Sequence, residues 1–461
     1  MMTESDLIKK VIREEESAGC YNVKINGITA YTLLRQLFRQ KLLVEAGLEA
    51  MQLKGTLRKS SLLPLFKSSL ISFWHVLKLV LGKNRIPIVF LSFPRMEKIN
   101  NIYVEKFTDP LIDVAGITTP YVIFETGRMG VHLRPRIHSE KVINVDIIRV
   151  ITTVLSVLGA RRFNQKHKEE FATLMSSLRS LSKDTVCEKI IVKQFLVRYY
   201  EIKIYEYLFR RLKTKFLLGP TRPAETFIAG HRAGALVCEL QHGITYGETV
   251  LYSGYRDPIM IPDYFLAYGD NKPSDVYGMD EERIINIGWA LQNYIASIHP
   301  EMQSSNESVL VISDPEITET LFQVIIRLAN DNPKVTFEIR PHPHEIIPEK
   351  CLASISNLQN VKIQDNKINI TEALMSFNMV IGENSTVLYE ALAVNKKVGR
   401  LFYDGLNPKY LVADDKESFW EIRNQTDFES FLKEDVSSKK SKCIYSPFNR
   451  NKFAEIINCN A

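Results

Sequence analysis

The length, composition and charge of the chain limit what kind of protein it can be. Its 461 residues are too many for one ordinary hydrophobic core and predict two domains. Hydrophobic residues make up 45% of the chain and charged residues 24%, which excludes a disordered or fibrous protein. The net charge of +6 is small for this length. Because the basic residues are spread out and no nucleic-acid-binding motif occurs, no nucleic acid is expected as a partner.

Several features predict a protein that stays in the cytoplasm. The N-terminus, MMTESDLIKKVIREEE, is charged throughout and does not contain the apolar core of a signal peptide. No stretch approaches about 18 uninterrupted apolar residues, the length that a membrane-spanning helix needs. The six cysteines are far apart in the sequence, without a CxxC pair or metal-ligand spacing, and indicate reduced, mostly buried thiols.

Residues 1–83 are expected to form a helical N-terminal extension. Apolar residues recur at intervals of three and four between Ile28 and Leu43, which predicts one apolar helix face. The stretch 54–85 contains lysines, arginines, leucines and aromatic residues but no acidic residue. Such a basic amphipathic stretch can lie on an anionic membrane surface. The alternative is a helix that packs on the body of the protein with its lysines in water.

From Ile86 onward the pattern changes to short apolar segments that alternate with helical ones. Alternation of this kind specifies parallel sheets with right-handed crossovers, and hence an α/β fold. The expected strands are 86–93, 121–126, 141–148, 215–219, 235–243, 264–269 and 283–289 in the first half, and 308–314, 335–344, 361–365, 379–385 and 397–402 in the second. The expected helices of the second half are 316–331, 348–357, 370–376 and 385–394.

These segments divide the chain into two Rossmann-like domains. Residues 84–294 are expected to form the N-terminal domain and 308–445 the C-terminal domain, joined by the polar linker 295–307. Residues 446–461 are expected to be a C-terminal tail. Because ligands of open α/β sheets bind beyond the carboxyl ends of the strands, a cleft between the two domains is the expected binding site.

The strongest candidate site lies at two strand ends of the C-terminal domain. One carries cationic side chains and the other carries hydroxyl, amide and carboxylate groups: Arg340, His342 and His344 on the first, and Glu383, Asn384, Ser385 and Thr386 on the second. A helix that opens at Asn384 or Ser385 directs free N–H groups toward the cleft and can bind a phosphate. Glu390 in that helix can bind ribose hydroxyls. The alternative is that Ser385 caps the helix and Glu390 is solvated or ion-paired.

This half of the sequence resembles the donor domain of GT-B glycosyltransferases. The segments RPHPH and GENSTVLYEALA, followed by KKV, carry the resemblance. The His-Pro element is similar to that of bacterial sialyltransferases, Kdo transferases and CDP-glycerol-type polyol-phosphate transferases. The resemblance implies that His342, Ser385 and Thr386 hold the nucleotide phosphates. Non-hydrolysing UDP-sugar 2-epimerases share this architecture and have a similar glutamate at the ribose.

The first half carries a second resemblance. ELQHGI (239–244), then Tyr246, YSGYR and PDYFLAYGD, resembles bacterial capsule and lipopolysaccharide glycosyltransferases, as do INGITAYTLLRQ and SFPRMEK followed by KFTDPLID. Gln241, His242 and Gly243 follow an expected strand, and Gly243 lets the backbone approach a ligand closely. We expect these residues and Tyr246 in the cleft, with His242 binding the leaving phosphate or orienting the acceptor. The alternative is a buried histidine held by a backbone carbonyl.

Transfer of a sugar also needs a base for the acceptor hydroxyl, unless the donor phosphate performs this role. Asp109 and Asp113 are the first candidates, and Glu125 is the next. The acidic base motif of the sialyltransferases does not occur. There is also no DxD element, so neither a metal nor a cofactor other than the nucleotide sugar is expected.

Together these features predict an inverting, metal-independent glycosyltransferase. Its donor is a CMP-, UDP-, GDP- or CDP-linked sugar, and its acceptor is a glycan or lipid-linked glycan of the capsule or lipopolysaccharide. The expected location is the cytoplasm, with a possible peripheral contact to the inner face of the cell membrane through 54–85. The alternatives are a sugar-nucleotide epimerase or hydrolase on the same scaffold, and a non-catalytic sugar-nucleotide-binding protein of an assembly complex.

Overall fold

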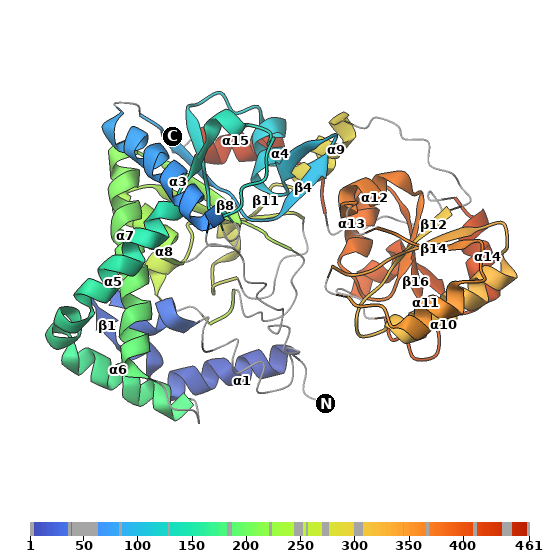
Figure 1. The fold of residues 1–461 in the computed structure, drawn as a ribbon, viewed down its shortest axis with the longest axis horizontal. Helices are drawn as coiled ribbons and strands as arrows, with labels where there is room; N and C mark the ends of the chain where they lie inside the picture. Colours follow the sequence, from blue (N-terminus) through green and yellow to red (C-terminus); the bar gives the residue numbers. More distant parts are fainter. Residues whose placement is uncertain are drawn as a thin grey trace.

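A computed structural model places most of the chain in two lobes (Figure 1). The lobe formed by the first part of the chain is the larger, and the other lobe is formed by described residues between 308 and 435. The structure describes residues 4–35, 38, 63–82, 85–127, 130–181, 187–220, 224–243, 252–254, 257–269, 276–298, 308–343, 345–365, 368–408, 413–435 and 445–458.

The N-terminal domain is built on a seven-stranded sheet in the order β11-β10-β9-β8-β3-β6-β7. All neighbouring strands are parallel. The strands are β3 (Ile88–Leu91), β6 (Tyr121–Glu125), β7 (Val142–Asn144), β8 (Phe216–Pro220), β9 (Leu236–Leu240), β10 (Tyr264–Ala267) and β11 (Ile284–Asn286). Each expected strand of this half is present. The strand expected at 141–148 is shorter, because a helix begins at Asp146.

Helices cover this sheet and extend from it. They are α1 (Glu4–Ser17), α3 (Leu63–Leu81), α4 (Thr108–Ala115), α5 (Asp146–Lys166), α6 (Lys168–Leu181), α7 (Glu188–Leu212), α8 (Ala224–Ala233) and α9 (Ala290–Ile298). Short 3-10 helices are η1 (Cys20–Asn22), η3 (Ser139–Lys141), η4 (Pro258–Met260) and η5 (Glu281–Arg283). By length and composition alone, α3 is able to cross a membrane, and 11% of it is buried inside the structure.

The C-terminal domain has a six-stranded parallel sheet in the order β14-β13-β12-β15-β16-β17. The strands are β12 (Ser308–Ile312), β13 (Thr336–Arg340), β14 (Val361–Ile363), β15 (Met379–Gly382), β16 (Lys397–Leu401) and β17 (Trp420–Ile422). The helices are α10 (Thr318–Asp331), α11 (Glu349–Ile355), α12 (Ile370–Ser376), α13 (Val387–Ala393) and α14 (Gln425–Lys433), with the 3-10 helix η6 (Ala413–Ser418). The two parallel sheets confirm the predicted fold class.

Two hairpins differ from the expectation. The segment 1–83, expected to be helical, contains the antiparallel pair β1 (Lys24–Ile25) and β2 (Ile28–Thr29). The loop after the first expected strand contains β4 (Met96–Ile99) and β5 (Ile102–Glu105). The two residues of each turn have positive φ, in Asn26-Gly27 and Asn100-Asn101. Asparagine and glycine tolerate this conformation, and two such residues form the turn that suits a tight hairpin.

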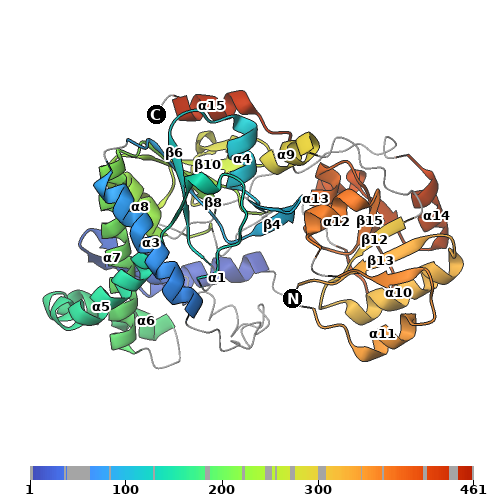
Figure 2. The same cartoon turned by 45° about the horizontal axis from the view of Figure 1, so that its top comes forward.

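The end of the chain returns to the N-terminal domain. Residues 446–461 were expected to be a tail, but they include α15 (Arg450–Asn458), which packs against α4. Figure 2 shows this red helix on the first lobe, away from the remaining orange and red elements. The Trp289 and Tyr445 rings stack at 4.4 Å, and Phe448 and Phe453 are buried in the same core as β3 and β8. The apolar residues of α15 therefore complete the core of the N-terminal domain.

The β4–β5 hairpin of the N-terminal domain contacts the C-terminal domain. Its strand β4 contacts α12, and one hydrophobic cluster contains residues of both, including Ile99 and Leu374. Polar contacts reinforce this junction. Thr371 donates a hydrogen bond to the Glu97 carboxylate, and the Asn369 side chain donates to the backbone carbonyl of Lys98. The two domains therefore meet through the hairpin and the amino-terminal end of α12.

Candidate functional site

The two motifs of the C-terminal domain lie at the same edge of its sheet. In the register of the parallel strands, Ile312 of β12 is paired with Arg340 of β13 on one side and with Gly382 of β15 on the other. The loops that follow Arg340 and Gly382 therefore leave the sheet at one level. They are separated by the width of two strands, about 10 Å. The sheet topology thus brings together the two segments that the sequence singled out.

The Arg340 guanidinium group binds acceptors within the C-terminal domain. It donates hydrogen bonds to Gln364 Oε1 at 2.5 Å and to the Ile368 carbonyl at 2.8 Å. Burial lowers the pKa of Arg340 from its ordinary value. The Arg340 side chain thus holds the loop that follows β14. The sequence had suggested that this cation is directed at a phosphate. Arg340 as a whole is 9% exposed, and a guanidinium group buried to this degree needs protein acceptors, which these two oxygens supply.

The loop that begins at Pro341 carries His342, which is half-buried. The backbone N–H of His342 donates to Glu345 Oε2 at 2.8 Å. The other oxygen of this carboxylate accepts from the Ser313 and Thr318 hydroxyls, both at 2.7 Å. Glu345 therefore fixes the backbone on which the His342 ring is mounted. His344 lies outside the described residues.

The segment after Gly382 presents exposed polar groups. Asn384 and Thr386 are exposed and Ser385 is half-buried. The Ser385 hydroxyl accepts a hydrogen bond from the backbone N–H of Val387 at 3.2 Å, and α13 begins at Val387, two residues later than the expected helix 385–394. Glu383 is buried, and its carboxylate accepts from the Asn407 backbone N–H at 2.5 Å. Glu383 thus anchors the loop, and its neighbours remain accessible.

Glu390 joins the two domains through Lys106. The Lys106 ammonium group donates to both carboxylate oxygens of Glu390, at 2.7 and 2.8 Å, and lies 3.7 Å from Glu97. Burial disfavours the charged ammonium group, but Glu390 and Glu97 outweigh this effect and hold the pKa of Lys106 above its ordinary value. The sequence left open whether Glu390 binds a ribose or is ion-paired. In this structure it is ion-paired.

The ELQHG motif of the N-terminal domain lies next to the segment that contains Lys106. His242 follows β9, and its ring lies between Phe93 and Phe107, with centroid distances of 4.7 and 5.2 Å. Phe107 is the neighbour of Lys106, so the Lys106–Phe107 segment contacts both His242 and Glu390. Gln241 is buried and holds the backbone, because its amide donates to the Gly243 carbonyl and accepts from the Tyr268 N–H.

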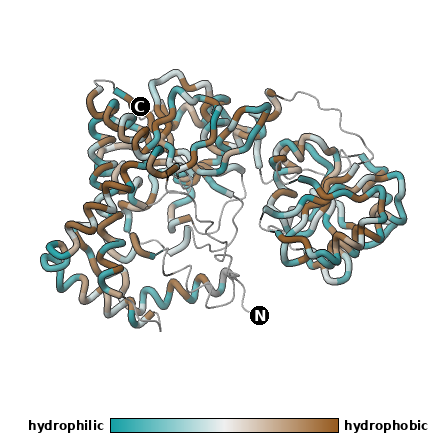
Figure 3. The backbone as a smooth tube through the Cα atoms, viewed as in Figure 1, coloured by the Kyte–Doolittle hydropathy of each residue, from teal (hydrophilic) through white to brown (hydrophobic). Residues whose placement is uncertain are grey.

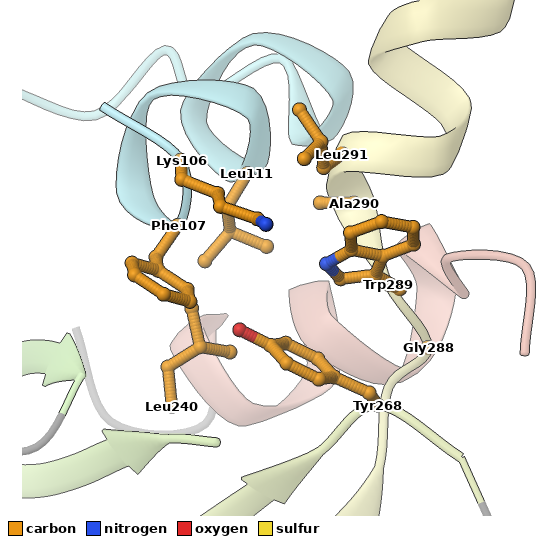
Figure 4. A pocket seen from close by; sticks show the side chains of 9 residues that line it. All are labelled: Lys106, Phe107, Leu111, Leu240, Tyr268, Gly288, Trp289, Ala290 and Leu291. Carbon is orange, nitrogen blue, oxygen red and sulfur yellow. The ribbon is translucent and has the colours of Figure 1, made fainter. Parts of the chain in front are cut away.

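A small cavity opens beside this segment. It has a volume of about 10 Å³, enough for one water molecule, and its lining includes Lys106, Tyr268 and Trp289. Figure 4 shows the Lys106 ammonium group, the Tyr268 hydroxyl and the Trp289 indole nitrogen directed into it. Tyr268 is 3% exposed, and its hydroxyl has no hydrogen-bond partner among the described residues. Burial raises the pKa of Tyr268, so the hydroxyl retains a proton to donate.

Sequence reasoning missed Lys106, Tyr268 and Trp289. Lys106 and Tyr268 lie inside KFTDPLID and PDYFLAYGD, two segments that carried the resemblance, but no spacing rule distinguishes them from ordinary core residues. Their position at the carboxyl ends of the strands was the available signal. Tyr246 and the rest of 244–251 lie outside the described residues.

Asp109 and Glu125, which the sequence suggested as bases, bind one buried arginine. Arg136 donates to Asp109 Oδ2 at 2.9 Å and to Asp109 Oδ1 at 2.7 Å, and it also contacts Glu125. Arg136 and Asp109 side chains have 0% exposure and that of Glu125 has 4%. A carboxylate with these partners cannot reach an acceptor hydroxyl without breaking the ion pair. The structure therefore gives Asp109 and Glu125 a place in the framework of the domain, in contrast to the expectation.

Asp113 lies one turn further along α4. Its carboxylate is 43% exposed and lies 3.8 Å from His138 Nε2. This position is on the side of α4 that faces η3 and not at the Lys106–Glu390 pair. Within the described ranges, no group of three or more His, Cys, Asp or Glu side chains is arranged to hold a metal ion.

The pH dependence of stability is set in part by His132, which bridges Glu125 and Asp146. Burial opposes the charged imidazole, but hydrogen bonds to both carboxylates outweigh it and raise the pKa of His132 to about 9. The pKa is higher in the folded state than in the unfolded state. The stabilisation is therefore complete below about pH 6.5 and is lost as the pH rises through about 9.

We expect the melting temperature of the wild type to fall between pH 7 and pH 10 (roughly the window between the unfolded and folded pKa values) more steeply than that of His132→Asn. In the acid range the sign reverses for Glu125. Burial raises the pKa of Glu125, but His132 and the two arginines outweigh burial and lower this pKa to about 2. The contribution of Glu125 to stability is therefore lost as the pH falls from 4.5 toward 2. Parallel melting profiles of wild type and His132→Asn above pH 7 would contradict the assignment.

Comparison with known proteins adds information about the fold. No protein-family model matches the sequence, and no curated protein is detectably similar to it. A protein from Listeria monocytogenes, described provisionally as a UDP-N-acetylglucosamine 2-epimerase, superimposes with a TM-score of 0.50 and 11% identity, covering 81% of this chain and 95% of its own.

Two other solved structures cover the same share of the chain. A UDP-GlcNAc 2-epimerase from Methanocaldococcus jannaschii has a TM-score of 0.49 and 10% identity, with 81% of this chain and 99% of that one covered. A glycosyltransferase from Rickettsia africae has a TM-score of 0.45 and 12% identity, with 81% and 98% covered. At these identities the likeness concerns the fold. The two Rossmann-like parallel-sheet domains and the superposition on the Listeria monocytogenes protein show that the chain has the GT-B fold.

Proposed function

We propose that the chain is a glycosyltransferase that transfers a sugar from a nucleotide-activated donor to a capsule or lipopolysaccharide acceptor. The observation that supports this most directly is the Lys106–Phe107 segment. It contacts Glu390 of the C-terminal domain through Lys106 and His242 of the N-terminal domain through Phe107. Lys106 follows the β4–β5 hairpin, His242 follows β9, and Glu390 lies in the helix after β15, so segments that follow strands of both domains meet at one place, on the side where ligands of such sheets bind.

In this proposal the C-terminal domain holds the nucleotide. The exposed groups of Asn384, Ser385 and Thr386, together with the His342 ring, bind the phosphates. Glu390 accepts hydrogen bonds from the ribose hydroxyls. Because Glu390 is occupied by Lys106, donor binding requires an exchange of partners, in which the ammonium group turns from the carboxylate to a donor phosphate. This exchange keeps a nearly buried charge paired in both states.

The N-terminal domain then supplies the acceptor side. We assign the acceptor hydroxyl to the neighbourhood of His242, and the Tyr268 hydroxyl and Lys106 to the donor sugar and its phosphate. Catalysis rests on stabilising the departing nucleotide with fixed donors and on holding the acceptor oxygen in line with the sugar carbon. The reaction is inverting and needs no metal in this scheme. A CMP-, UDP-, GDP- or CDP-linked donor and a glycan or lipid-linked glycan acceptor in the cytoplasm complete the proposal.

The nucleotide is identified by thermal stability. A nucleotide present at about 100 times its Kd adds about 2.7 kcal/mol to the free energy of unfolding, and we expect one of CMP, UDP, GDP or CDP to do so. Ser385→Ala/Thr386→Ala should reduce this increase, and Ser356→Ala, an exposed serine of the same domain, should leave it unchanged.

The products formed with and without an acceptor distinguish sugar transfer from epimerisation and hydrolysis of the donor. With a sugar donor of the identified nucleotide, release of the free nucleotide is expected only when a glycan acceptor is present. Epimerised or hydrolysed donor in the absence of acceptor identifies an epimerase or hydrolase instead. If no nucleotide and no nucleotide sugar changes the melting temperature, the chain does not bind such a donor and the proposal fails.

A further inference from the structure

Two neighbouring helices of the N-terminal domain, α3 and α5, turn many large apolar side chains toward the solvent, although each also packs apolar residues such as Leu79 and Ile148 against the core. The buried residues of α3 are Ser68 and Ser72, and those of α5 are Asp146, Ile148, Thr152 and Ser156. The exposed large hydrophobic side chains among the described residues are concentrated on the same helices: Leu63, Phe66, Leu70, Ile71, Phe73, Trp74 and Leu81 on α3, and Val150, Ile151, Val154, Leu155, Val157 and Leu158 on α5.

Water does not favour this arrangement. A helix on the surface of a soluble domain turns its apolar stripe toward the core and its polar face outward. Here Phe66 is 63% exposed, Trp74 59% and Leu158 76%, whereas two serines of α3 and the Thr152 and Ser156 side chains of α5 are buried. Exposed apolar side chains gathered on two helices that contact each other indicate an interaction site. Figure 3 shows the hydrophobic stretches along both helices on the outside of the first lobe.

The inward polar residues fix α3 along the domain. The Ser72 hydroxyl donates to the Asn144 carbonyl and accepts from the Ile147 N–H, both at 2.9 Å, which binds α3 to the end of β7 and the start of α5. Ser68 lies 3.0 Å from His132 Nε2. A helix held by these bonds against a sheet edge and a second helix lies flat. The geometry therefore favours contact with a surface, and not passage of α3 through a membrane.

The charge on α3 and α5 selects the kind of surface. Every exposed charged side chain on these two fully described helices is positive: Lys67, Lys78, Arg149, Arg161, Arg162 and Lys166. Their one acidic residue, Asp146, is buried and bound to His132. Two copies of this face would repel each other, because like charges would be brought together. Basic residues around exposed leucine, phenylalanine and tryptophan suit the headgroup region of an anionic bilayer.

We propose that α3 and α5 together form a membrane-docking face that binds the surface of anionic phospholipid bilayers. The apolar side chains of both helices enter the boundary between headgroups and acyl chains, and basic side chains beside them contact lipid phosphates. This extends the surface expected from 54–85 to α5, which the sequence did not single out. It does not depend on nucleotide binding or transfer.

The test is flotation of the full chain with vesicles of phosphatidylcholine and phosphatidylglycerol in equal parts, compared with phosphatidylcholine alone. We expect binding to the anionic vesicles. Phe66→Ser/Trp74→Ser/Leu158→Ser should reduce it at least about tenfold. Lys67→Glu/Lys78→Glu should reduce it at least about 30-fold, because each basic residue near an anionic surface contributes about fivefold. The matched controls Leu352→Ser and Lys433→Glu, on the C-terminal domain, should bind like the wild type.

Trp74 provides a second measurement that does not depend on variants folding well. It is the exposed tryptophan of three, since Trp289 and Trp420 are 3% and 6% exposed. Insertion should shift the emission of Trp74 to shorter wavelength on anionic vesicles, and Trp74→Phe should abolish the shift while binding persists. Absence of binding by the wild type, or equal binding by all variants, overturns the proposal. So does a dimer in solution that the apolar variants dissociate without any vesicle binding, because the face would then belong to a second copy.

Discussion

Replacing Arg136 by methionine should strongly destabilise the N-terminal domain. The substitution leaves the Asp109 and Glu125 carboxylates buried without their shared guanidinium group. Removing one partner of a buried ion pair reduces the free energy of unfolding by about 3–5 kcal/mol. For domains of this size that corresponds to a decrease of about 6–20 °C in melting temperature. Thermal and denaturant unfolding of Arg136→Met measure the effect.

Arg134 provides the matched control. Its guanidinium group binds the same Glu125 carboxylate at 3.0 Å, but it is 34% exposed. Because water screens such a pair, Arg134→Met should change the free energy of unfolding by no more than about 1 kcal/mol. Equal melting temperatures for the two variants would show that the buried network does not support the domain. In that case Asp109 and Glu125 would again be candidates for the acceptor base.

Replacing His342 by alanine should have the largest effect on transfer without a matching loss of stability. In the proposed complex its ring is a donor to the nucleotide phosphates, where negative charge grows in the transition state. Loss of one such donor typically reduces kcat by about 100-fold or more. The loop should keep its shape, because the backbone N–H of His342, and not the ring, binds Glu345. Steady-state kinetics with the identified donor, together with a melting curve, test this expectation.

Ile346 is the control for the same loop. It is 90% exposed, so Ile346→Ala should leave both kcat/KM and the melting temperature unchanged. If His342→Ala retains wild-type kcat/KM and still binds nucleotide, the histidine has no part in the donor site. The Ser385 and Thr386 hydroxyls would then have to bind the phosphates without it.

Much of the C-terminal domain follows from the sequence because its strands are short, apolar and evenly spaced. The helix expected at 370–376 has those bounds, and β12 to β16 each lie within their expected segments. Parallel topology also places the ends of β13 and β15 at one edge, so the neighbourhood of His342 and Ser385 could be predicted. The hairpin β4–β5 could not, because its turn is Asn-Asn and its strands alternate only weakly.

The partners of charged side chains were not predictable in the same way. Lys106 and Glu390 are 284 residues apart in the sequence, and their pairing depends on how two separately folded sheets meet. Arg136 lies outside any regular strand, yet its guanidinium group binds the carboxylate of Asp109, the first candidate for the base. A carboxylate after a strand has the same local sequence signal whether it faces a cleft or a buried arginine. Only the three-dimensional placement distinguishes these cases.

The position of α15 links the folding of the two domains during synthesis. Phe448 and Phe453 belong to the core that β3 and β8 begin, and the Phe453 ring packs against Phe216. A ribosome therefore produces the whole C-terminal domain before the residues that close the N-terminal core emerge. Domains usually fold in the order in which they are made. In this chain the core of the first domain is completed only after the second domain has been synthesised.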